Sequence, residues 1–321
     1  MRFLYKVYKV EEKCIMKKKI LALGLAAVFA AISLSACGGS KTATTKASEA
    51  GSEKSTEKGS EKASESAKET EKADSGKERV YKVGVNGSDH EEWEKVNELL
   101  KKDNIKVDLV EFSDYVKPNE ALEDGEIDLN AFQTEIYFNN FNKERGYTDL
   151  GILAYTQVAP MGIYSSKYKK LDEATGHLTI AIPNDVTNGG RALRFLEKNG
   201  FLTLKKDAGL TPTVMDVEKY NKDVELVEMV ATQIPKSLPD LSFACINNGV
   251  AKDAGLTLKK DAIVYEDYKD PDMKNYWNII ACKKDKIESD DFQKIKKAYN
   301  SDEVKKVIEE HYDGQSIPVW D

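Results

Sequence analysis

The stretch LTIAIPNDVTNGGRALRFLEKNG, residues 178–200, contains the alternation of strand, loop and helix on which the fold prediction depends. Its apolar start, residues 178–182, predicts a buried strand, and residues 190–199 predict a helix that Gly200 ends. The glycine-bearing loop between them would direct free backbone N–H groups toward an anion. Arg191 adds a planar guanidinium that can hold a carboxylate by two hydrogen bonds. A surface arginine at the start of a helix is the alternative, and this motif alone does not decide between the two interpretations.

The same alternation recurs on both sides of this stretch. Residues 81–85 alternate apolar and polar positions and predict a strand, after which Ser88 and Glu91 predict a capping box at the start of a helix. Pro118 stands where it can open another helix, which Gly125 would end. Further strands are predicted at residues 107–110, 127–132 and 241–246. Strands that alternate with helices predict an α/β fold with a mostly parallel sheet.

The N-terminal residues have the pattern of an exported lipoprotein. Three lysines at residues 17–19 precede an apolar run, residues 20–32, which is shorter than the roughly 20 residues that span a bilayer. The sequence LSAC that ends at Cys37 resembles a bacterial lipobox. We therefore expect residues 1–36 to be a signal peptide and Cys37 to carry the lipid anchor, palmitate among its acyl groups. A start at either Met1 or Met16 leaves this pattern unchanged.

The segment after Cys37 has the composition of a flexible tether. Residues 38–78 contain no aliphatic residue larger than alanine and no aromatic residue. Such a segment cannot bury enough apolar surface to offset the entropy lost on ordering. We expect residues 37–79 to be a disordered tether that holds a folded body near the membrane surface. A solvated helix is the alternative for this segment.

Charge, cysteines and histidines argue against several classes of protein. The net charge of −7 disfavours a nucleic-acid-binding protein, which needs a clustered basic face. Cys245 and Cys282 lie in apolar runs and are expected to be buried free thiols, although a disulfide between them is an alternative. Three histidines without a partner motif indicate neither a catalytic nor a metal site, and no nucleophile or phosphate-binding motif occurs. We expect a protein that is not an enzyme and has no cofactor.

Five segments, in order along the chain, resemble the NlpA family of methionine-binding lipoproteins. These segments are EFSDYVKPNEALEDGEIDLNAFQ (111–133), VAPMGIYSSK (158–167), IPNDVTNGGRAL (182–193), FACINNGVA (243–251) and YWNIIAC (276–282). The resemblance covers about residues 80–321, and the ordered set is more specific than any one segment. Members of this family are the substrate-binding components of methionine-type ABC importers.

The resemblance implies an α/β, two-lobed fold of the type II periplasmic-binding-protein class, with a ligand cleft between lobes joined by two hinge strands. Residues 80–157 and 266–321 would form the first lobe, and residues 158–265 the second. The hinge strands would lie near residues 155–163 and 265–279.

The resemblance also places seven residues of this chain in the ligand pocket. Aromatic residues would surround a thioether, an arginine would hold the carboxylate, and two asparagines would bind the polar end of the ligand. These residues are Tyr115, Phe132, Tyr137, Arg191, Asn247 and Asn278, together with Thr134, which stands where the family commonly has a histidine. Without the family pattern, the aromatic residues would be read as hydrophobic core. Because of Thr134, a methionine derivative, another apolar amino acid or a dipeptide stays open as the ligand.

Together these features predict a lipid-anchored solute-binding protein on the extracytoplasmic face of the cell membrane. Its ligand would be an amino acid, with methionine as the first candidate, and its partners would be an ABC permease and the ATPase of that permease. We expect a monomer attached to the membrane by its N-terminal lipid. A surface lipoprotein or adhesin that keeps the fold is the competing class, and a tethered hydrolase is a weaker third.

Overall fold

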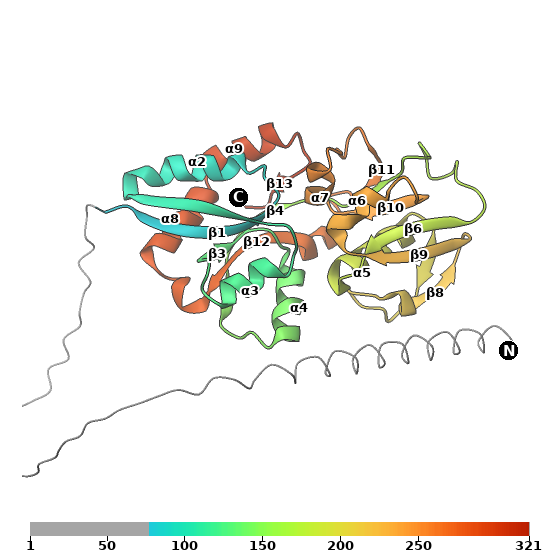
Figure 1. The fold of residues 1–321 in the computed structure, drawn as a ribbon, viewed down its shortest axis with the longest axis horizontal. Coiled ribbons are helices and arrows are strands. Elements are labelled where there is room, and N and C mark those ends of the chain that lie inside the picture. The colour runs from blue at the N-terminus through green and yellow to red at the C-terminus, as the bar shows by residue number, and fades with distance from the viewer. Residues whose placement is uncertain (1–76, 321) are drawn as a thin grey trace, which may run out of the picture. The chain divides into compact units, whose positions relative to one another are not determined.

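The computed structural model describes residues 77–320, so the expected signal peptide, Cys37 and nearly all of the tether lie outside the described residues. The described residues form two lobes, each built on a β-sheet (Figure 1). Among them, no helix combines the length and the apolarity needed to cross a bilayer.

The sheet of lobe 1 has six strands and that of lobe 2 has five. In sheet order, lobe 1 contains β13 (Ile317–Pro318), β4 (Leu150–Val158), β12 (Trp277–Lys283), β3 (Leu129–Asn130), β1 (Arg79–Asn86) and β2 (Ile105–Phe112). Lobe 2 contains β11 (Ala262–Tyr265), β5 (Gly162–Tyr164), β10 (Phe243–Ile246), β6 (Leu178–Pro183) and β9 (Val224–Met229). A separate two-stranded sheet is formed by β7 (Leu202–Leu204) and β8 (Val217–Tyr220).

The two main sheets repeat one topology. In lobe 1, β2, β1 and β3 are parallel, and β12 and β4 follow in antiparallel pairing. In lobe 2, β9, β6 and β10 are parallel, and β5 and β11 follow in antiparallel pairing. Most strands of each sheet run in one direction, as predicted, but both sheets are mixed, because β5 and β12 each enter a sheet directly from the other lobe and run against its parallel strands. The chain crosses between the lobes at residues 159–161 and 266–276.

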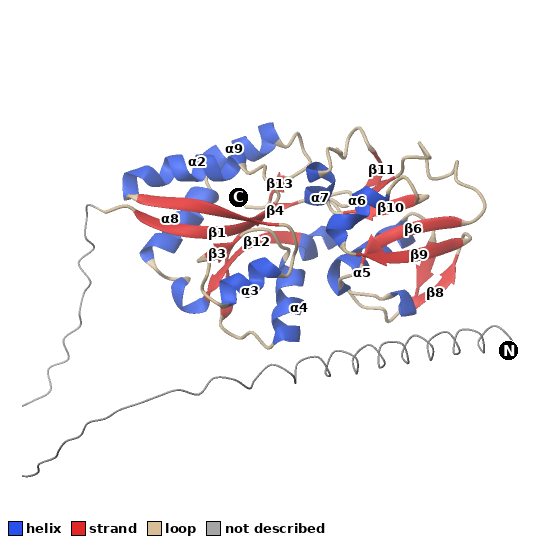
Figure 2. Cartoon of the chain, in the orientation of Figure 1, coloured by secondary structure: helices blue, strands red, loops and turns tan. Residues whose placement is uncertain are grey.

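Helices cover both faces of the lobe 1 sheet (Figure 2). The helices of one face are α2 (Glu91–Leu100), α8 (Asp290–Tyr299) and α9 (Asp302–His311), and those of the other are α3 (Lys117–Glu123) and α4 (Glu135–Arg145). Strand β12 divides its side chains between the two faces. Ile280 and Cys282 pack with the first set of helices, whereas Ile279 and Ala281 pack with the second. The apolar run of β12 thus reflects a strand that is buried on both faces.

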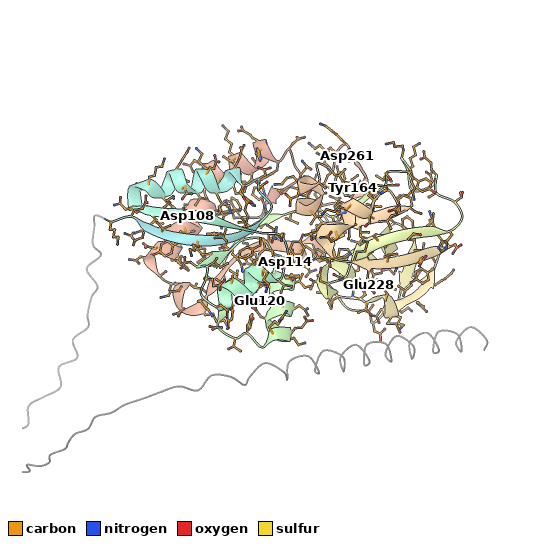
Figure 3. The ribbon with its side chains drawn as sticks, in the orientation of Figure 1. Asp108, Asp114, Glu120, Tyr164, Glu228 and Asp261 are labelled. Carbon is orange, nitrogen blue, oxygen red and sulfur yellow. The ribbon has the colours of Figure 1, made fainter. Side chains whose placement is uncertain are left out.

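Lobe 2 is built in the same way. Its helices are α5 (Val186–Lys198), α6 (Ile234–Ser237) and α7 (Asn248–Asp253). On β10, Phe243 and Cys245 pack with α5, while Ala244 and Ile246 pack with α6 and α7. Tyr164 on β5 belongs to the second group (Figure 3). Both faces of this sheet are therefore apolar core.

Of the four cysteines, the two in the described residues, Cys245 and Cys282, are free and fully buried, as the first interpretation predicted. Cys245 lies on β10 in lobe 2 and Cys282 lies on β12 in lobe 1. The alternative of a disulfide between them is wrong, because each thiol is part of the core of a different lobe. Burial raises the pKa of the Cys282 thiol to about 12, so the thiol stays protonated.

Several predicted element boundaries change. Helix α2 begins at Glu91 with His90 as its N-cap and no side-chain cap, so the predicted capping box at Ser88 is wrong. Strand β3 is limited to two residues, whereas Pro118 lies in the first turn of α3 as predicted. Helix α5 begins at Val186, earlier than predicted, because the Asp185 carboxylate accepts a hydrogen bond from the backbone N–H of Asn188 at 2.9 Å and caps it.

Gly190 in helix α5 packs too closely against its neighbours to tolerate a side chain. A Cβ atom there would lie 2.8 Å from Thr211 Cα and 3.1 Å from Pro212 Cδ. We predict that Gly190→Ala destabilises the fold by about 1–3 kcal/mol through overpacking, measured by urea unfolding without ligand. Gly249 in α7 is the matched control, since a Cβ there meets no atom within 4 Å. Gly249→Ala should leave stability unchanged or raise it, and equal losses in both variants would contradict the packing argument.

Candidate ligand-binding site

A cavity of about 620 Å³ lies where the two lobes face each other. Its walls are largely the segments that follow the parallel strands β1, β2 and β3 of lobe 1 and β6, β9 and β10 of lobe 2. Ligands of open α/β sheets bind at the carboxyl ends of strands in this way. All seven residues expected in the pocket line this cavity, namely Tyr115, Phe132, Thr134, Tyr137, Arg191, Asn247 and Asn278.

The lobe 1 wall of the cavity carries three aromatic rings. The ring centroids of Tyr115, Phe132 and Tyr137 form a triangle with sides of 6.0, 6.1 and 6.3 Å. The Tyr137 hydroxyl donates to the Tyr115 backbone carbonyl at 3.1 Å, which holds the Tyr137 ring against the segment that carries Tyr115. Burial raises the pKa of both tyrosines, so their hydroxyls stay neutral. The wall is suited to an apolar or thioether side chain.

The segments around these rings are held by polar contacts. Asp114, where lobe 1 approaches lobe 2 (Figure 3), accepts hydrogen bonds from the backbone N–H groups of Val116 and Lys117, both at 2.8 Å. These contacts fix the turn that presents Tyr115. The buried side chains of Asn119, Asn130 and Gln133 bond one another at 2.6–2.9 Å and fix the segment that carries Phe132.

Arg191 reaches the cavity from the second turn of α5 and is almost fully buried. Its Nε donates to Glu266 Oε1 and Oε2 at 3.0 and 3.1 Å, and its Nη2 donates to Glu266 Oε2 and to the Ala159 carbonyl at 2.5 and 2.9 Å. Among the described residues, Nη1 has no hydrogen-bond partner. A ligand carboxylate can therefore reach Nη1, but the two-hydrogen-bond edge expected from the sequence is already occupied.

The start of α5 is not free to bind an anion. Both oxygens of the Asp185 carboxylate accept from the Asn188 side-chain amide at 3.0 Å, and one also accepts from the Asn188 backbone N–H and the Thr187 hydroxyl. The expected anion site of free N–H groups is therefore wrong. A capping carboxylate occupies the position that an anion would take.

Four residues that line the cavity each have a buried side-chain amide oxygen with no hydrogen-bond partner among the described residues. They are Asn86, Gln157, Asn247 and Asn248. Asn247 is oriented by its own amide nitrogen, which donates to Asn188 Oδ1 at 2.7 Å. Buried acceptors without donors are costly, so an N–H donor that reached one of these oxygens would be bound favourably.

Thr134 and Asn278 lie together at the edge of the cavity, where they form an isolated antiparallel bridge. The Thr134 hydroxyl accepts from the Tyr137 backbone N–H at 3.3 Å, which makes Thr134 the N-cap of α4. Thr134 thus supports the helix that carries Tyr137, a function that the sequence comparison did not reveal.

Two residues important to the site were not predicted. Asn188 lies inside a segment already singled out, and its spacing from Arg191 on the same helix could have indicated it. Glu266 is 75 positions from Arg191 in sequence, and no local pattern connects the two. Their pairing exists only because the crossing segment passes beside α5.

A second group of contacts joins the lobes at the other side of the cavity. Lys252 of α7 donates to the Asp89 carbonyl at 3.2 Å and lies 3.3 Å from its carboxylate. The same ammonium stands 4.3 Å from the ring centroid of Tyr312. Nearby, the Asn248 side chain donates to the Gln315 carbonyl at 2.8 Å. The lobes are therefore closed upon each other.

Comparison with known proteins agrees with this architecture. The model of the NlpA lipoprotein family matches residues 81–320. The chain belongs to the NlpA lipoprotein family. A curated member, the D-methionine-binding lipoprotein MetQ of Escherichia coli strain K12, is 40% identical over 243 residues, which cover 74% of this chain and 88% of that one.

Solved structures of similar proteins share the fold. A nutrient-binding protein from Burkholderia cenocepacia, bound to methionine, has a TM-score of 0.71 and 36% identity, covering 75% of this chain and 100% of that chain. The substrate-binding protein of a methionine transporter from Streptococcus pneumoniae has a TM-score of 0.71 and 38% identity, covering 75% and 96%. The two-lobed binding-protein fold expected from the sequence is confirmed, and these relatives are binding proteins rather than enzymes.

The Lys252 contacts predict a latch between the lobes of this family member. Lys252→Met removes the ammonium but keeps most of the apolar stem, and should weaken closure by about 1 kcal/mol. Pulsed electron paramagnetic resonance, with one spin label on each lobe, should then give a longer and broader distance distribution. Lys259→Met is the control, because the contact of Lys259 with Asp313 also joins the lobes but is exposed. Identical distributions for Lys252→Met and the parent would contradict the latch.

Proposed function

We propose that this chain is the substrate-binding component of an ABC importer and that its ligand is methionine or a close derivative. The observation that carries the proposal is the division of the cavity between the lobes. Lobe 1 supplies the aromatic triangle of Tyr115, Phe132 and Tyr137, and lobe 2 supplies Arg191 Nη1 and the Asn247 amide oxygen. A thioether side chain and a zwitterionic backbone match these two walls.

The proposed roles follow from the contacts. The aromatic triangle would hold the side chain, Arg191 Nη1 would donate to the carboxyl group, and the Asn247 amide oxygen would accept from the ammonium. Thr134 and Asn278 would border the same pocket. Residues 159–161 and 266–276 would act as the hinge on which the lobes open. The protein would bind and deliver its ligand without changing it.

The proposed location and partners rest on the family. The names of the relatives, lipoproteins and transporter binding proteins, support a lipid anchor at Cys37 and delivery of ligand to a permease with its ATPase. We propose that residues 37–78 tether a monomeric body to the extracytoplasmic face of the membrane, since Arg79, which the prediction included in the tether, is the first residue of β1.

Calorimetry with methionine on the ligand-free protein tests the proposed function. Asn247→Ala should weaken methionine binding about 10- to 100-fold, because it removes one acceptor in a desolvated pocket, about 1–3 kcal/mol. Arg191 is less suitable for this test, since its removal would leave Glu266 buried without a cation, which costs about 3–5 kcal/mol of stability. Asn140→Ala, an exposed change on α4, is the control and should bind like the parent. No binding of methionine by the parent would refute the proposal.

The anchor has its own test. Cys37→Ala should move the protein from the detergent phase to the aqueous phase, or leave an uncleaved precursor, because two acyl chains are needed for stable attachment. Ligand binding should not change, since the residues that line the cavity all lie within residues 86–316. Unaltered detergent partitioning and mature mass would show that Cys37 is not the lipid site.

A further inference from the structure

The ion pair of Arg191 and Glu266 is almost completely buried. Their side chains are 4% and 10% exposed. Arg191 lines the cavity, whereas Glu266 lies behind it and belongs to the second crossing between the lobes. The Nη1 atom of the guanidinium is therefore left for a ligand, while Nε and Nη2 bond Glu266.

The pair is held rigidly, because it is bonded to both crossings. Glu266 Oε2 accepts from the Met161 backbone N–H at 2.7 Å, and the Glu266 backbone N–H donates to the Met161 carbonyl at 3.0 Å. Arg191 bonds the Ala159 carbonyl of the same crossing and stands 4.3 Å from the ring centroid of Tyr276. The counter-ion of Arg191 is thus a fixed part of the fold and is not displaced by a ligand.

The remaining charges of the cavity are mostly negative. Asp89, Glu92, Glu111 and Asp253 line it, against Lys252 as the other lysine or arginine in its lining. Lys252 is itself engaged with Asp89. Four lining residues, Asn247 among them, also carry a buried amide oxygen without a partner among the described residues. A ligand anion would gain little net Coulomb attraction here, whereas a ligand ammonium would find acceptors of both kinds.

We infer that Glu266 is a positioning residue that makes this site select its ligand by the ammonium group and accept an uncharged carboxyl end. Glu266 neutralises Arg191 and holds it so that Nη1 donates a hydrogen bond to a carbonyl oxygen, whether or not that oxygen is charged. The substrate class is therefore primary amines with an adjacent carbonyl, including carboxamides of the amino acid. This inference rests on the proposed function and deepens it.

Three probes separate the two ends of the ligand in calorimetry on the full folded body. Methionine and methioninamide should bind the parent with Kd values within about tenfold of each other. N-acetylmethionine, which lacks the ammonium, should bind at least about 100-fold more weakly than methionine, because the acceptors stay unpaired. This comparison needs no variant and is decisive even where a variant does not fold.

Glu266→Gln then tests the residue itself. The glutamine keeps the shape and one acceptor for Arg191 but removes the counter-charge, so the guanidinium acts fully on a ligand carboxylate. The ratio of methionine affinity to methioninamide affinity should rise by about tenfold or more. Asp267→Asn is the matched control, since it removes one charge at the next, exposed position and should leave the ratio unchanged.

Each failure has a distinct meaning. If the parent binds neither methionine nor methioninamide, the proposed function is wrong and the inference falls with it. If methionine binds the parent but exceeds methioninamide by more than about tenfold, the inference alone is overturned. A folded Glu266→Gln variant with an unchanged ratio also overturns it. A purely structural role of Glu266 would weaken both probes equally and leave the ratio constant.

Discussion

The buried pair of Arg191 and Glu266 is the constraint on which the binding architecture depends. The chain crosses from lobe 1 to lobe 2 before β5 and returns before β12. The pair binds both crossings to helix α5. A buried ion pair contributes little net stability, because desolvation offsets most of the Coulomb attraction. Removing one partner is costly, however, since the other charge stays in the interior. The pair therefore acts mainly as a geometric restraint, and it fixes a ligand-facing nitrogen at the point where the lobes join.

Much of the fold was predictable because its strands and helices leave local signals. The apolar run of β6, the alternation in β1 and the proline at the start of α3 depend on neighbours within a few positions. The mixed character of the sheets was not predictable in this way. Strands β5 and β12 are apolar on both faces like the parallel strands β6 and β10, so composition does not reveal their direction. Direction is set by which lobe the chain leaves before each strand, and that is a property of the whole topology.

In the candidate site, too, local sequence signals predicted some features and the topology of the whole chain determines the others. The residues of the aromatic triangle and Arg191 could each be named from its own stretch of sequence by the resemblance to the family. The structure places them around one cavity. What those motifs could not supply is the state of each group. Arg191 is already paired with Glu266, and the start of α5 is already capped by Asp185. The sequence predicted an open anion site, but in the structure carboxylates of the protein itself occupy it. Asp185 directly precedes helix α5, whereas Glu266 lies in the second crossing, far from α5 in sequence.

The distribution of the cavity between the lobes links recognition to closure. Tyr115, Phe132 and Tyr137 belong to lobe 1, whereas Arg191 and Asn247 belong to lobe 2. A ligand shifts an opening equilibrium only by the contacts that differ between the two states. A molecule with the apolar end alone would contact only the aromatic wall of lobe 1 and would favour neither state. A molecule with both ends, spaced to reach both walls, gains its second set of contacts only when the lobes meet, so ligand length and charge together determine closure.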